Sequence, residues 1–361
     1  MTEGYRAMKT RNKRILHAIT VSSVGGAQSV VVNLANSQCE YNEVFVLSSA
    51  SGEAWKALDS RVHVISVKEL HRAISLWDII VFCKLIYWRV RLRPDIIHLH
   101  SSKMGMLGRL VFPNNKTIYT VHGFDSIRVA NRSFLFLEKL LKNWCRYIVG
   151  VSKYDVKNLQ DEGIIKNVKF VYNGVEDFSS DIPSAQNASL LARLVGFRGE
   201  YKRVIMSIAR DDAPKRLDIF LEIARKMPEY AFVWVGNSKD YSTPDNVMLL
   251  GQVPMGYQLL AASDLFILCS DYEGLPMSII EAQLFSKPVV SSRVGGVTEI
   301  LDGNNGFAVD NTADSFREAI QRIFETDSIY HNYSFLSRKT YEKCFSLVNM
   351  VNGYDDLYSS L

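Results

Sequence analysis

The chain has 361 residues, of which 47% are hydrophobic and 22% are charged, the balance of a globular protein with room for two domains. This composition excludes disorder as the main state, and the strongly apolar stretches fall short of the roughly 20 residues that a membrane-spanning helix needs. The net charge of +4 is uneven: residues 1–175 hold 25 Lys and Arg against 13 Asp and Glu, and residues 176–361 hold 17 against 25. The first half is therefore suited to meeting anions.

Two features indicate the compartment. The first residues are polar and basic, which predicts no secretory signal. The five cysteines are scattered and never form a CxxC pair, which argues against a disulfide framework or a structural zinc site and favours a reducing cytosol. We therefore expect a cytoplasmic protein.

The first half of the chain alternates short apolar runs with amphipathic segments of helical period. This alternation is typical of a parallel sheet that helices cover on both faces. Strands are predicted at 14–19, 44–48, 62–66, 95–100, 117–121, 147–151 and 169–172.

A polar, irregular segment at 178–190 predicts a linker between domains. The alternation then restarts, with strands predicted at 203–208, 231–235, 247–250, 264–268, 288–291 and 306–309. Two doubly wound α/β domains follow from this pattern. Ligands of such sheets bind beyond the carboxyl ends of the strands, so residues directly after strands are the candidates for function.

Two loops after predicted strands are suited to phosphate. Gly25 and Gly26 open a helix, where the backbone can approach an anion and the helix N-terminus attracts it; the alternative is a plain tight turn. Arg210 and Lys215 share a loop in the second half and form a good pair for a diphosphate. The alternative for this pair is two solvated charges that neighbouring aspartates neutralise.

The strongest motif is EGLPMSIIEA, from Glu273 to Ala282. Gly274 permits a close backbone approach, and Pro276 suits the first turn of a helix. Glu281 lies in an apolar helical context, where an unpaired carboxylate is costly. A helix N-terminus between two carboxylates can bind a phosphate at its amides and hydroxyls at its carboxylates, whereas the alternative is a capped helix with surface glutamates.

Histidines mark the same edge in the first half. His122 stands beside a glycine at a strand end, where it can face a ligand, and the alternative is a structural histidine. His100, with Ser101 and Lys103 after it, is expected to line the same site on the acceptor side. His98 shares a strand face with His100, but no cysteine or carboxylate stands at ligand spacing, so no metal site is predicted.

Taken together, these segments resemble the retaining glycosyltransferases of family 4, which have the GT-B architecture of two Rossmann-like domains facing each other across a cleft. The matching segments run in order through nearly the whole chain: the GGA loop, PDIIHLHSSKMGMLGR, VHGF, VGVS, VYNGV, AR…K, LLGQV, EGLPMSIIEA and GGVTEI. The resemblance implies an acceptor-binding domain over 1–177, a nucleotide-sugar-binding domain over 178–334, and a helical segment over 335–361 that crosses back to the N-terminal domain.

The resemblance also implies roles. Glu273 would contact hydroxyls of the donor sugar, and His122 would lie beside the transferred sugar. Arg210 and Lys215 would neutralise the diphosphate. The donor-binding positions would be Gly25, Gly26, Val253, Gly274, Leu275, Met277 and Glu281, the last on the ribose. The chain departs from the family pattern at Ala209, at Gly236-Asn237-Ser238 and at Gln28, so the local backbone path there does not follow from the resemblance.

The function so predicted is transfer of a sugar, with retention, from a UDP- or GDP-linked donor to a hydroxyl of an oligosaccharide or lipid-linked glycan acceptor in surface polysaccharide biosynthesis. No D-x-D sequence is present, so we expect no metal, and the nucleotide-sugar is a substrate rather than a cofactor. Two alternatives are a non-hydrolysing sugar-nucleotide epimerase on the same fold and a basic nucleic-acid-binding protein. No interleaved aromatic-basic motif supports nucleic acid as a partner.

A membrane surface is a further expected partner. The stretch 76–93 predicts a helix rich in Trp, Ile, Phe and Tyr that ends in basic residues, and 134–146 is a second candidate. Such a helix suits the headgroup layer of an anionic membrane, so the protein is expected to be peripheral on its cytoplasmic face. The alternative is two ordinary helices that pack one face into a core.

Overall fold

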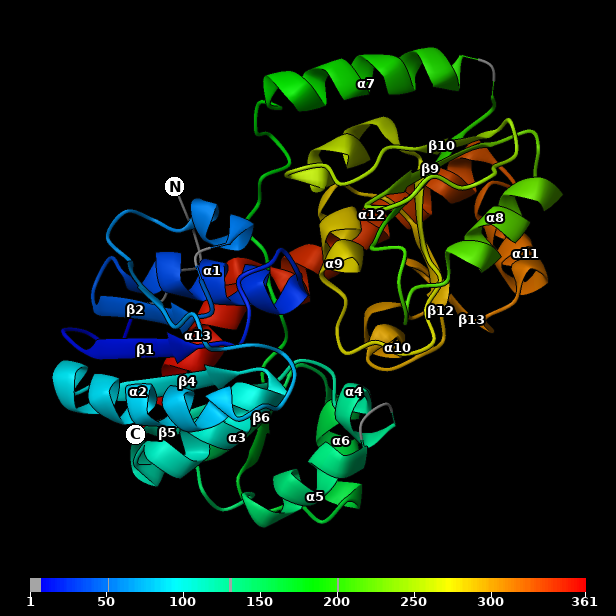
Figure 1. Cartoon of the computed structure of the whole chain (residues 1–361). Coiled ribbons are helices and arrows are strands. Elements are labelled where there is room, and N and C mark those ends of the chain that lie inside the picture. Colours follow the sequence, from blue (N-terminus) through cyan, green and yellow to red (C-terminus); the bar gives the residue numbers. More distant parts are fainter. Residues whose placement is uncertain (1–7, 51, 130–131, 200) are drawn as a thin grey trace. The chain divides into compact units, whose positions relative to one another are not determined.

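The computed structural model describes residues 8–361 apart from 51, 130–131 and 200. The chain divides into two compact units, each a parallel sheet between layers of helices (Figure 1). Unit 1 comprises the described residues up to Glu176 together with Leu347–Leu361, and unit 2 comprises Asp177–Ser346. The second part of unit 1 is therefore contributed by the end of the chain.

The sheet of unit 1 has seven strands in its described part, in the order β3-β2-β1-β4-β5-β6-β7. They are β1 (Arg14–Ala18), β2 (Glu43–Ser48), β3 (His63–Ser66), β4 (Ile96–His100), β5 (Thr117–Val121), β6 (Tyr147–Gly150) and β7 (Val168–Phe170). The central strands β4 and β5 are buried at every residue, as expected of parallel strands covered on both faces. Their apolar runs are therefore the clearest strand signals in the sequence.

Helices cover both faces of this sheet. They are α1 (Gly26–Gln38), η1 (Glu53–Ala57), α2 (Trp77–Leu92), α3 (Ser102–Val111), η2 (Asn114–Lys116), α4 (Asp125–Arg128), α5 (Arg132–Leu140), α6 (Lys153–Asp161) and α13 (Leu347–Tyr358). Helix α3 packs against both α2 and α5, and the apolar core of the unit includes Leu85 of α2, Leu107 of α3 and Leu135 of α5. Helices α1 and α13 pack against each other.

The sheet of unit 2 has six strands in its described part, in the order β10-β9-β8-β11-β12-β13. They are β8 (Val204–Ile208), β9 (Ala231–Val235), β10 (Val247–Leu249), β11 (Leu265–Leu268), β12 (Val289–Ser292) and β13 (Gly306–Val309). Its helices are α7 (Ala185–Arg198), α8 (Leu217–Lys226), η3 (Gly256–Ala262), α9 (Met277–Leu284), α10 (Val297–Ile300), α11 (Ala313–Ile323), α12 (Asp327–Thr340) and the π-helical turn η4 (Tyr341–Phe345). The core packs around Phe220, Phe232 and Trp234.

Two expectations about the connections need correction. The second half of the predicted linker at 178–190 is helical, because Ser184 caps α7 by accepting a hydrogen bond from the Asn187 backbone N–H. The segment that returns to unit 1 begins at Leu347, later than the expected residue 335, because α12 and η4 remain part of unit 2. In the described ranges, no helix combines the length and hydropathy that crossing a membrane would require.

Candidate active site

The predicted charged loops of unit 2 meet at one point of its sheet. Strands β8 and β11 are neighbours, and from them the chain builds the sheet outward in opposite directions. This switch in strand order leaves a crevice beyond the carboxyl ends of the two strands, where ligands of doubly wound sheets bind. Arg210 and Lys215 follow β8, and Glu273 follows β11, so the topology gathers these three residues at the switch point.

The two loops are tied together by backbone contacts. Lys215 forms an isolated antiparallel bridge with Ser270, and the Asp271 N–H donates to the Pro214 carbonyl at 2.9 Å. The Lys215 ammonium then forms an ion pair with the Glu273 carboxylate, and these side chains are only 16% and 10% exposed. This pair is therefore held in place by both loops and shielded from most of the solvent.

Arg210 is placed differently. Its side chain is 51% exposed and pairs with Asp212 at 2.9 Å, a solvated pair of the kind that opens easily. The other aspartate, Asp211, is used elsewhere: burial opposes its charge, but hydrogen bonds from the Ser238 backbone and from the Ser238 and Tyr241 hydroxyls lower its pKa to about 2. The Arg210 guanidinium is thus available to an incoming anion.

Helix α9 starts directly after this loop. Pro276 precedes its first residue, Met277, so the first N–H groups of the helix have no acceptor within the helix. Leu275, Pro276 and Met277 are buried, whereas Glu273 and Gly274 before them are partly exposed. Gly274 accepts a hydrogen bond from the Gly296 N–H at 2.8 Å, which fixes the turn before the helix.

Glu281 lies on α9 as the motif predicts. Part of its surface reaches solvent, but burial of its carboxyl raises the pKa of Glu281 to about 7. Among the described residues none forms a hydrogen bond or ion pair with this carboxyl. An unpaired carboxylate in such surroundings is costly unless a ligand supplies hydrogen-bond donors.

The loops after β9 and β10 border this region, and the first of them contains Gly236-Asn237-Ser238, where the chain departs from the family pattern. Gly236 has φ +114°, and a side chain there would meet the Ala209 carbonyl oxygen at 2.5 Å. Its N–H donates to the Gly251 carbonyl at 2.6 Å, and Asn237 accepts from the Gly251 N–H at 2.8 Å. These contacts fix the loop that leads to Val253, which is partly exposed.

The carboxyl edge of unit 1 carries the predicted glycine loop. Gly25 precedes α1, whose N-terminus has no side-chain cap, so its first amides remain available to an anion. The Gln28 side chain lies over this loop: its amide donates to the Val21 carbonyl at 2.9 Å, and a side chain at Gly25 would meet Gln28 Oε1 at 2.8 Å. Gln28, which departs from the family pattern, therefore holds the loop in place.

His122 lies just beyond β5 and is partly exposed, as a residue facing the ligand region should be. The structure does not favour a contact with the acceptor for the other three predicted residues, His100, Ser101 and Lys103. His100 is fully buried and both its ring nitrogens are hydrogen-bonded, to His17 and His122. Ser101, at φ +71°, bonds its hydroxyl to that of Thr20 at 2.6 Å.

Lys103 has a structural role that the sequence-based expectation missed. Its ammonium pairs with Asp78 at 2.5 Å and donates to the His71 and Ala73 carbonyls at 2.8 and 2.6 Å. These contacts attach the loop before α2, and the first turn of α2, to α3. We therefore correct the expectation that Lys103 meets the acceptor.

The sequence analysis also missed supporting residues. Gly295 has φ +55°, and a side chain there would lie 1.8 Å from the Glu273 carbonyl oxygen, so only glycine fits beneath the Glu273 loop. The signal was present in the GGVTEI segment, whose first glycine comes shortly after a predicted strand. The hydrogen-bonding partners of the buried histidines, Gln38 and Tyr358, carried no local signal because they come from distant parts of the chain.

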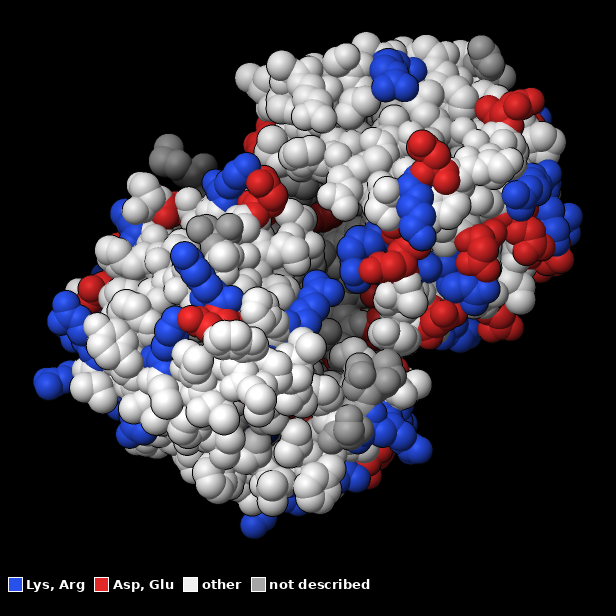
Figure 2. Space-filling view, viewed as in Figure 1, with Lys and Arg blue, Asp and Glu red and all other residues white. Residues whose placement is uncertain are grey.

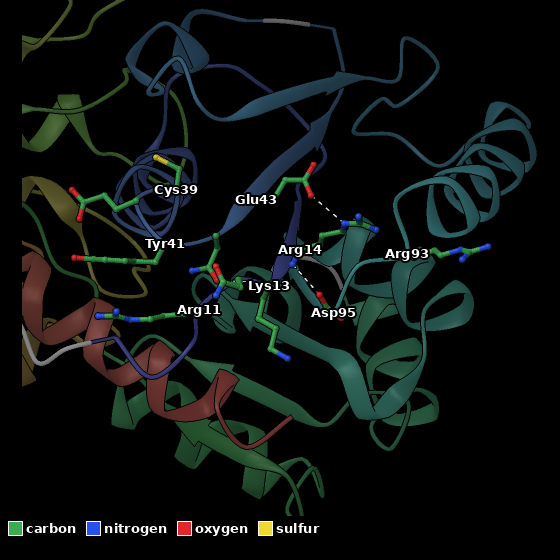
Figure 3. Close-up of a pocket in the computed structure, with 11 residues that line it drawn as sticks. Arg11, Lys13, Arg14, Cys39, Tyr41, Glu43, Arg93 and Asp95 are labelled. Atoms are coloured by element: carbon green, nitrogen blue, oxygen red, sulfur yellow. Dashed lines mark hydrogen bonds and ion pairs between the residues drawn. The ribbon is translucent and has the colours of Figure 1, made fainter.

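A cavity of about 810 Å³ in unit 1 lies at the opposite end of the sheet. Its lining includes Arg14 at the start of β1 and Glu43 at the start of β2, which pair at 3.0 Å (Figure 3). Asp95, just before β4, accepts from the Arg14 backbone in the same place. These are amino ends of strands, so this cavity is not part of the candidate active site.

Two family models match the chain: Glycosyltransferase Family 4 over residues 24–177 and Glycosyl transferases group 1 over residues 202–326. The chain belongs to this family of glycosyltransferases and has its GT-B fold. It is therefore an enzyme that moves a sugar from a nucleotide-sugar to an acceptor.

Individual relatives cover almost the whole chain. The O-antigen biosynthesis glycosyltransferase WbnH of Escherichia coli is 29% identical over 96% of this chain and 99% of its own length. A UDP-Gal:alpha-D-GlcNAc-diphosphoundecaprenol alpha-1,3-galactosyltransferase of Escherichia coli is 27% identical over 96% of each. The crystal structure of Anabaena HepE in complex with UDP-glucose superimposes with a TM-score of 0.83 at 19% identity, over 97% of this chain and 100% of that one, and has the same fold.

Proposed function

We propose that unit 2 binds a UDP-sugar at the β8–β11 switch point and that unit 1 receives a lipid-linked glycan acceptor. The observation that carries the first part is the Lys215–Glu273 ion pair beside the open N-terminus of α9. The names of two similar proteins support the donor, because one uses UDP-Gal and another was crystallised with UDP-glucose. Glu281, unpaired on the same helix, would accept hydrogen bonds from the ribose hydroxyls.

The Lys215–Glu273 pair has a direct consequence for donor binding. When a diphosphate arrives, Lys215 gains a more strongly charged partner, and a Glu273 oxygen becomes free to accept a hydrogen bond from a sugar hydroxyl. Arg210 and the free amides of α9 then meet the remaining phosphate oxygens. One binding event thus converts an internal ion pair into two contacts with substrate, one at the diphosphate and one at the sugar.

The same groups would lower the barrier to transfer. The reaction separates a sugar with oxocarbenium character from a diphosphate, so negative charge grows on the leaving group. Cations and amides already aimed at that position stabilise the charge as it develops, and such stabilisation is usually the main source of an enzyme's rate acceleration. No described residue of the site is an evident nucleophile, so attack from the front face, assisted by the departing phosphate oxygen, fits retention of configuration.

Donor binding can be tested by calorimetry. Glu281→Ala should weaken UDP binding by roughly tenfold to about 10⁴-fold, since one or two hydrogen bonds to a charged group are lost at about 1.5–3 kcal/mol each. Glu318→Ala, at an exposed position on α11 of the same unit, is the matched control and should bind UDP as the wild type does. A folded Glu281→Ala protein with unchanged UDP affinity would refute the ribose assignment.

The acceptor side of the proposal rests on the surface of α2. This helix buries Val81 and Leu85 toward the sheet, yet its outward positions are also apolar. They follow helical spacing and are exposed: Leu76, Ile79, Ile80, Cys83, Ile86, Tyr87 and Val90. Figure 2 shows the surface over α2 as largely uncharged, with basic residues near it. A helix that packs into a core needs only one apolar face, so the second, exposed apolar face of α2 needs another explanation.

An anionic membrane would account for the outward face of α2. Arg91 and Arg93 stand at the C-terminal end of the helix, where they can meet lipid headgroups while the apolar side chains enter the acyl boundary. Helix α5, which packs against α3 as α2 does, adds the exposed Phe136 and Leu140. A lipid-linked acceptor, like the diphosphoundecaprenol substrate in the name of one relative, would be presented at such a surface.

Vesicle binding tests the membrane proposal. The protein should co-sediment with anionic vesicles at low salt, and binding should fall as the screening length shortens from about 10 Å at 0.1 M to 3 Å at 1 M. Ile79→Ser with Val90→Ser on α2 should abolish binding, whereas Val195→Ser on α7, an equally exposed apolar site, should not. Equal and negligible binding of the wild type to anionic and neutral vesicles would refute the proposal.

A further inference from the structure

Unit 1 contains four neighbouring histidines whose arrangement the proposed function leaves unexplained. His17 of β1 and His98 of β4 are register partners, and His100 lies two residues further on the same face. His122 follows β5 at the ligand edge. Only His122 is partly exposed, and the other three are fully buried between the sheet and the pair α1 and α13. Buried imidazoles need hydrogen-bond partners, and here they use one another.

Three of these rings form a chain that leads away from the ligand edge. His122 Nε2 contacts His100 Nδ1 at 3.0 Å, and His100 Nε2 contacts His17 Nδ1 at 3.1 Å. His17 Nε2 then contacts the side-chain carbonyl oxygen of Gln38, the last residue of α1, at 2.8 Å. The chain thus ends on an atom that can only accept.

Because the Gln38 oxygen can only accept, it determines which ring donates in each hydrogen bond between these histidines. Burial lowers the pKa of His17 and His122 to about 4 and that of His100 well below its ordinary value, so at neutral pH each ring carries one proton. A neutral imidazole donates from one nitrogen and accepts at the other. His17 donates to Gln38 and accepts from His100, which in turn accepts from His122.

A second branch fixes the Gln38 amide itself. The amide also hydrogen-bonds the Tyr358 hydroxyl of α13, and since its oxygen faces His17, its NH₂ group is the donor to Tyr358. The Tyr358 hydroxyl contacts His98 Nδ1 at 2.6 Å, and His98 Nε2 contacts the Thr120 hydroxyl at 2.7 Å. Turning the amide over would require every donor in both branches to reverse.

We propose that Gln38 is a positioning residue that sets the tautomer of His122 through His17 and His100. His122 then carries its proton on Nε2 and presents the lone pair of Nδ1 at the ligand edge. Among the described residues, Nδ1 has no hydrogen-bond partner. The inference rests on the proposed function in taking a nucleotide-sugar as the ligand.

The tautomer decides which part of the substrate His122 can meet. A lone pair accepts a hydrogen bond from a hydroxyl and is repelled by a phosphate oxygen. His122 is therefore suited to contact a sugar hydroxyl rather than a phosphate oxygen. Because the hydrogen-bonded rings are neutral, these histidines carry no positive charge that would attract the phosphates.

The same contacts argue against a metal at this cluster. His17, His98 and His100 bring ring nitrogens within 4.8 Å of one another, close enough to suggest three ligands. Each ring nitrogen of these three residues already has a hydrogen-bond partner, however. A metal would have to displace that network, so the cluster is better explained as a relay of hydrogen bonds.

The tautomer is directly measurable. In the full-length protein labelled with ¹⁵N-histidine, two-bond proton–nitrogen correlation spectra at pH 7 should show His122 protonated at Nε2, with His122→Asn providing the assignment. An Nδ1-protonated or doubly protonated ring would overturn the proposal. This measurement on the wild-type protein needs no substrate, so it stands even if the proposed donor proves wrong.

Variants separate the relay from simple packing. Gln38→Leu, close in volume, should remove the preference of His122 for Nε2. Thr120→Val removes the hydroxyl that contacts His98 and Tyr354 but keeps the Gln38 carbonyl as the acceptor of His17, so it should not. UDP affinity should be unchanged in both, while the kcat/KM for the UDP-sugar should fall about fivefold in Gln38→Leu alone, the value of one hydrogen bond of about 1 kcal/mol. A Gln38→Leu protein with an unaltered His122 tautomer would overturn the role of Gln38.

Discussion

The two units have similar parallel sheets but opposite chemistry at their carboxyl edges. Unit 2 places formal charges there, with Lys215 paired to Glu273 and Arg210 paired to Asp212. Unit 1 places glycine amides and neutral histidines there. The difference means that the edge of unit 2 is suited to a ligand group that carries charge, such as a diphosphate, and the edge of unit 1 to neutral hydrogen-bonding groups.

The largest expected effect is at Lys215. Replacing it with alanine removes the shielded cation from the diphosphate and leaves Glu273 without its partner, so kcat should fall by about 10²–10³. Lys226→Ala is the matched control, because Lys226 is also ion-paired but lies at the far end of α8. Steady-state kinetics with the UDP-sugar measure both. Equal losses in the two variants would mean that unit 2 needs charge in general rather than at this position.

The support beneath Glu273 gives the next largest effect. In Gly295→Ala the new methyl group would lie 1.8 Å from the Glu273 carbonyl oxygen, so the loop must move, and displacement on the scale of 1 Å can cost about 10² in rate. Gly303→Ala is the control, because Gly303 also has positive φ but no atom within 4 Å. Both variants place an alanine at a positive φ, +55° at residue 295 and +90° at residue 303. A similar rate for both would show that strain, not the clash, matters.

These expectations show what the sequence could and could not provide. Apolar runs predicted the described strands to within one or two residues, because parallel strands covered on both faces are apolar throughout. Residues directly after strands, such as Glu273 and Lys215, were also predictable, since their placement follows from the chain direction alone. Their pairing with each other was not, because the two lie 58 residues apart and meet only through the strand order.

Lys103 and His100 were misassigned for a related reason. Lys103 does follow a strand, but Asp78 at the start of another helix captures its ammonium. His100 does end a strand, but its side chain points to the face that α1 and α13 cover rather than outward. Helix α7 was missed because its sequence buries few side chains, Asn187 and Leu194 among them, so no apolar stripe marks it.

Glu281 gives a smaller, pH-dependent effect. Its pKa in the folded protein is about 7, above the ordinary 4.5, so the stability associated with the protonated form is complete below pH 4.5 and is lost as the pH rises through 7. The loss amounts to about 3–4 kcal/mol at most, the difference between a pKa of about 7 and one of 4.5 at about 1.36 kcal/mol per unit. Glu281→Gln lacks this titration.

Thermal melting without ligand measures this difference. The Glu281→Gln protein and the wild type should melt at similar temperatures near pH 5, and the variant should melt at increasingly higher temperature up to pH 8. Ribose hydroxyls donate to the carboxylate and favour its charged form, so UDP should release a proton on binding near pH 7. If the melting temperatures of the two proteins differ by the same amount at every pH in this range, Glu281 is not in the buried, unpaired environment described above.

The smallest expected effect is that of metal removal, which should be none. The charge that neutralises the diphosphate comes from Lys215, Arg210 and the amides of α9, and the sequence has no D-x-D pair to hold a cation on the donor. Transferase activity should therefore be the same with and without excess EDTA. Activity that is lost with EDTA and restored only by Mn²⁺ or Mg²⁺ would contradict this prediction. A metal ion, rather than the side chains and amides of unit 2, would then neutralise the leaving group. The histidines of unit 1 offer an internal check, since a cation bound there would shift their ¹⁵N signals, whereas the hydrogen-bonded relay predicts spectra that EDTA leaves unchanged.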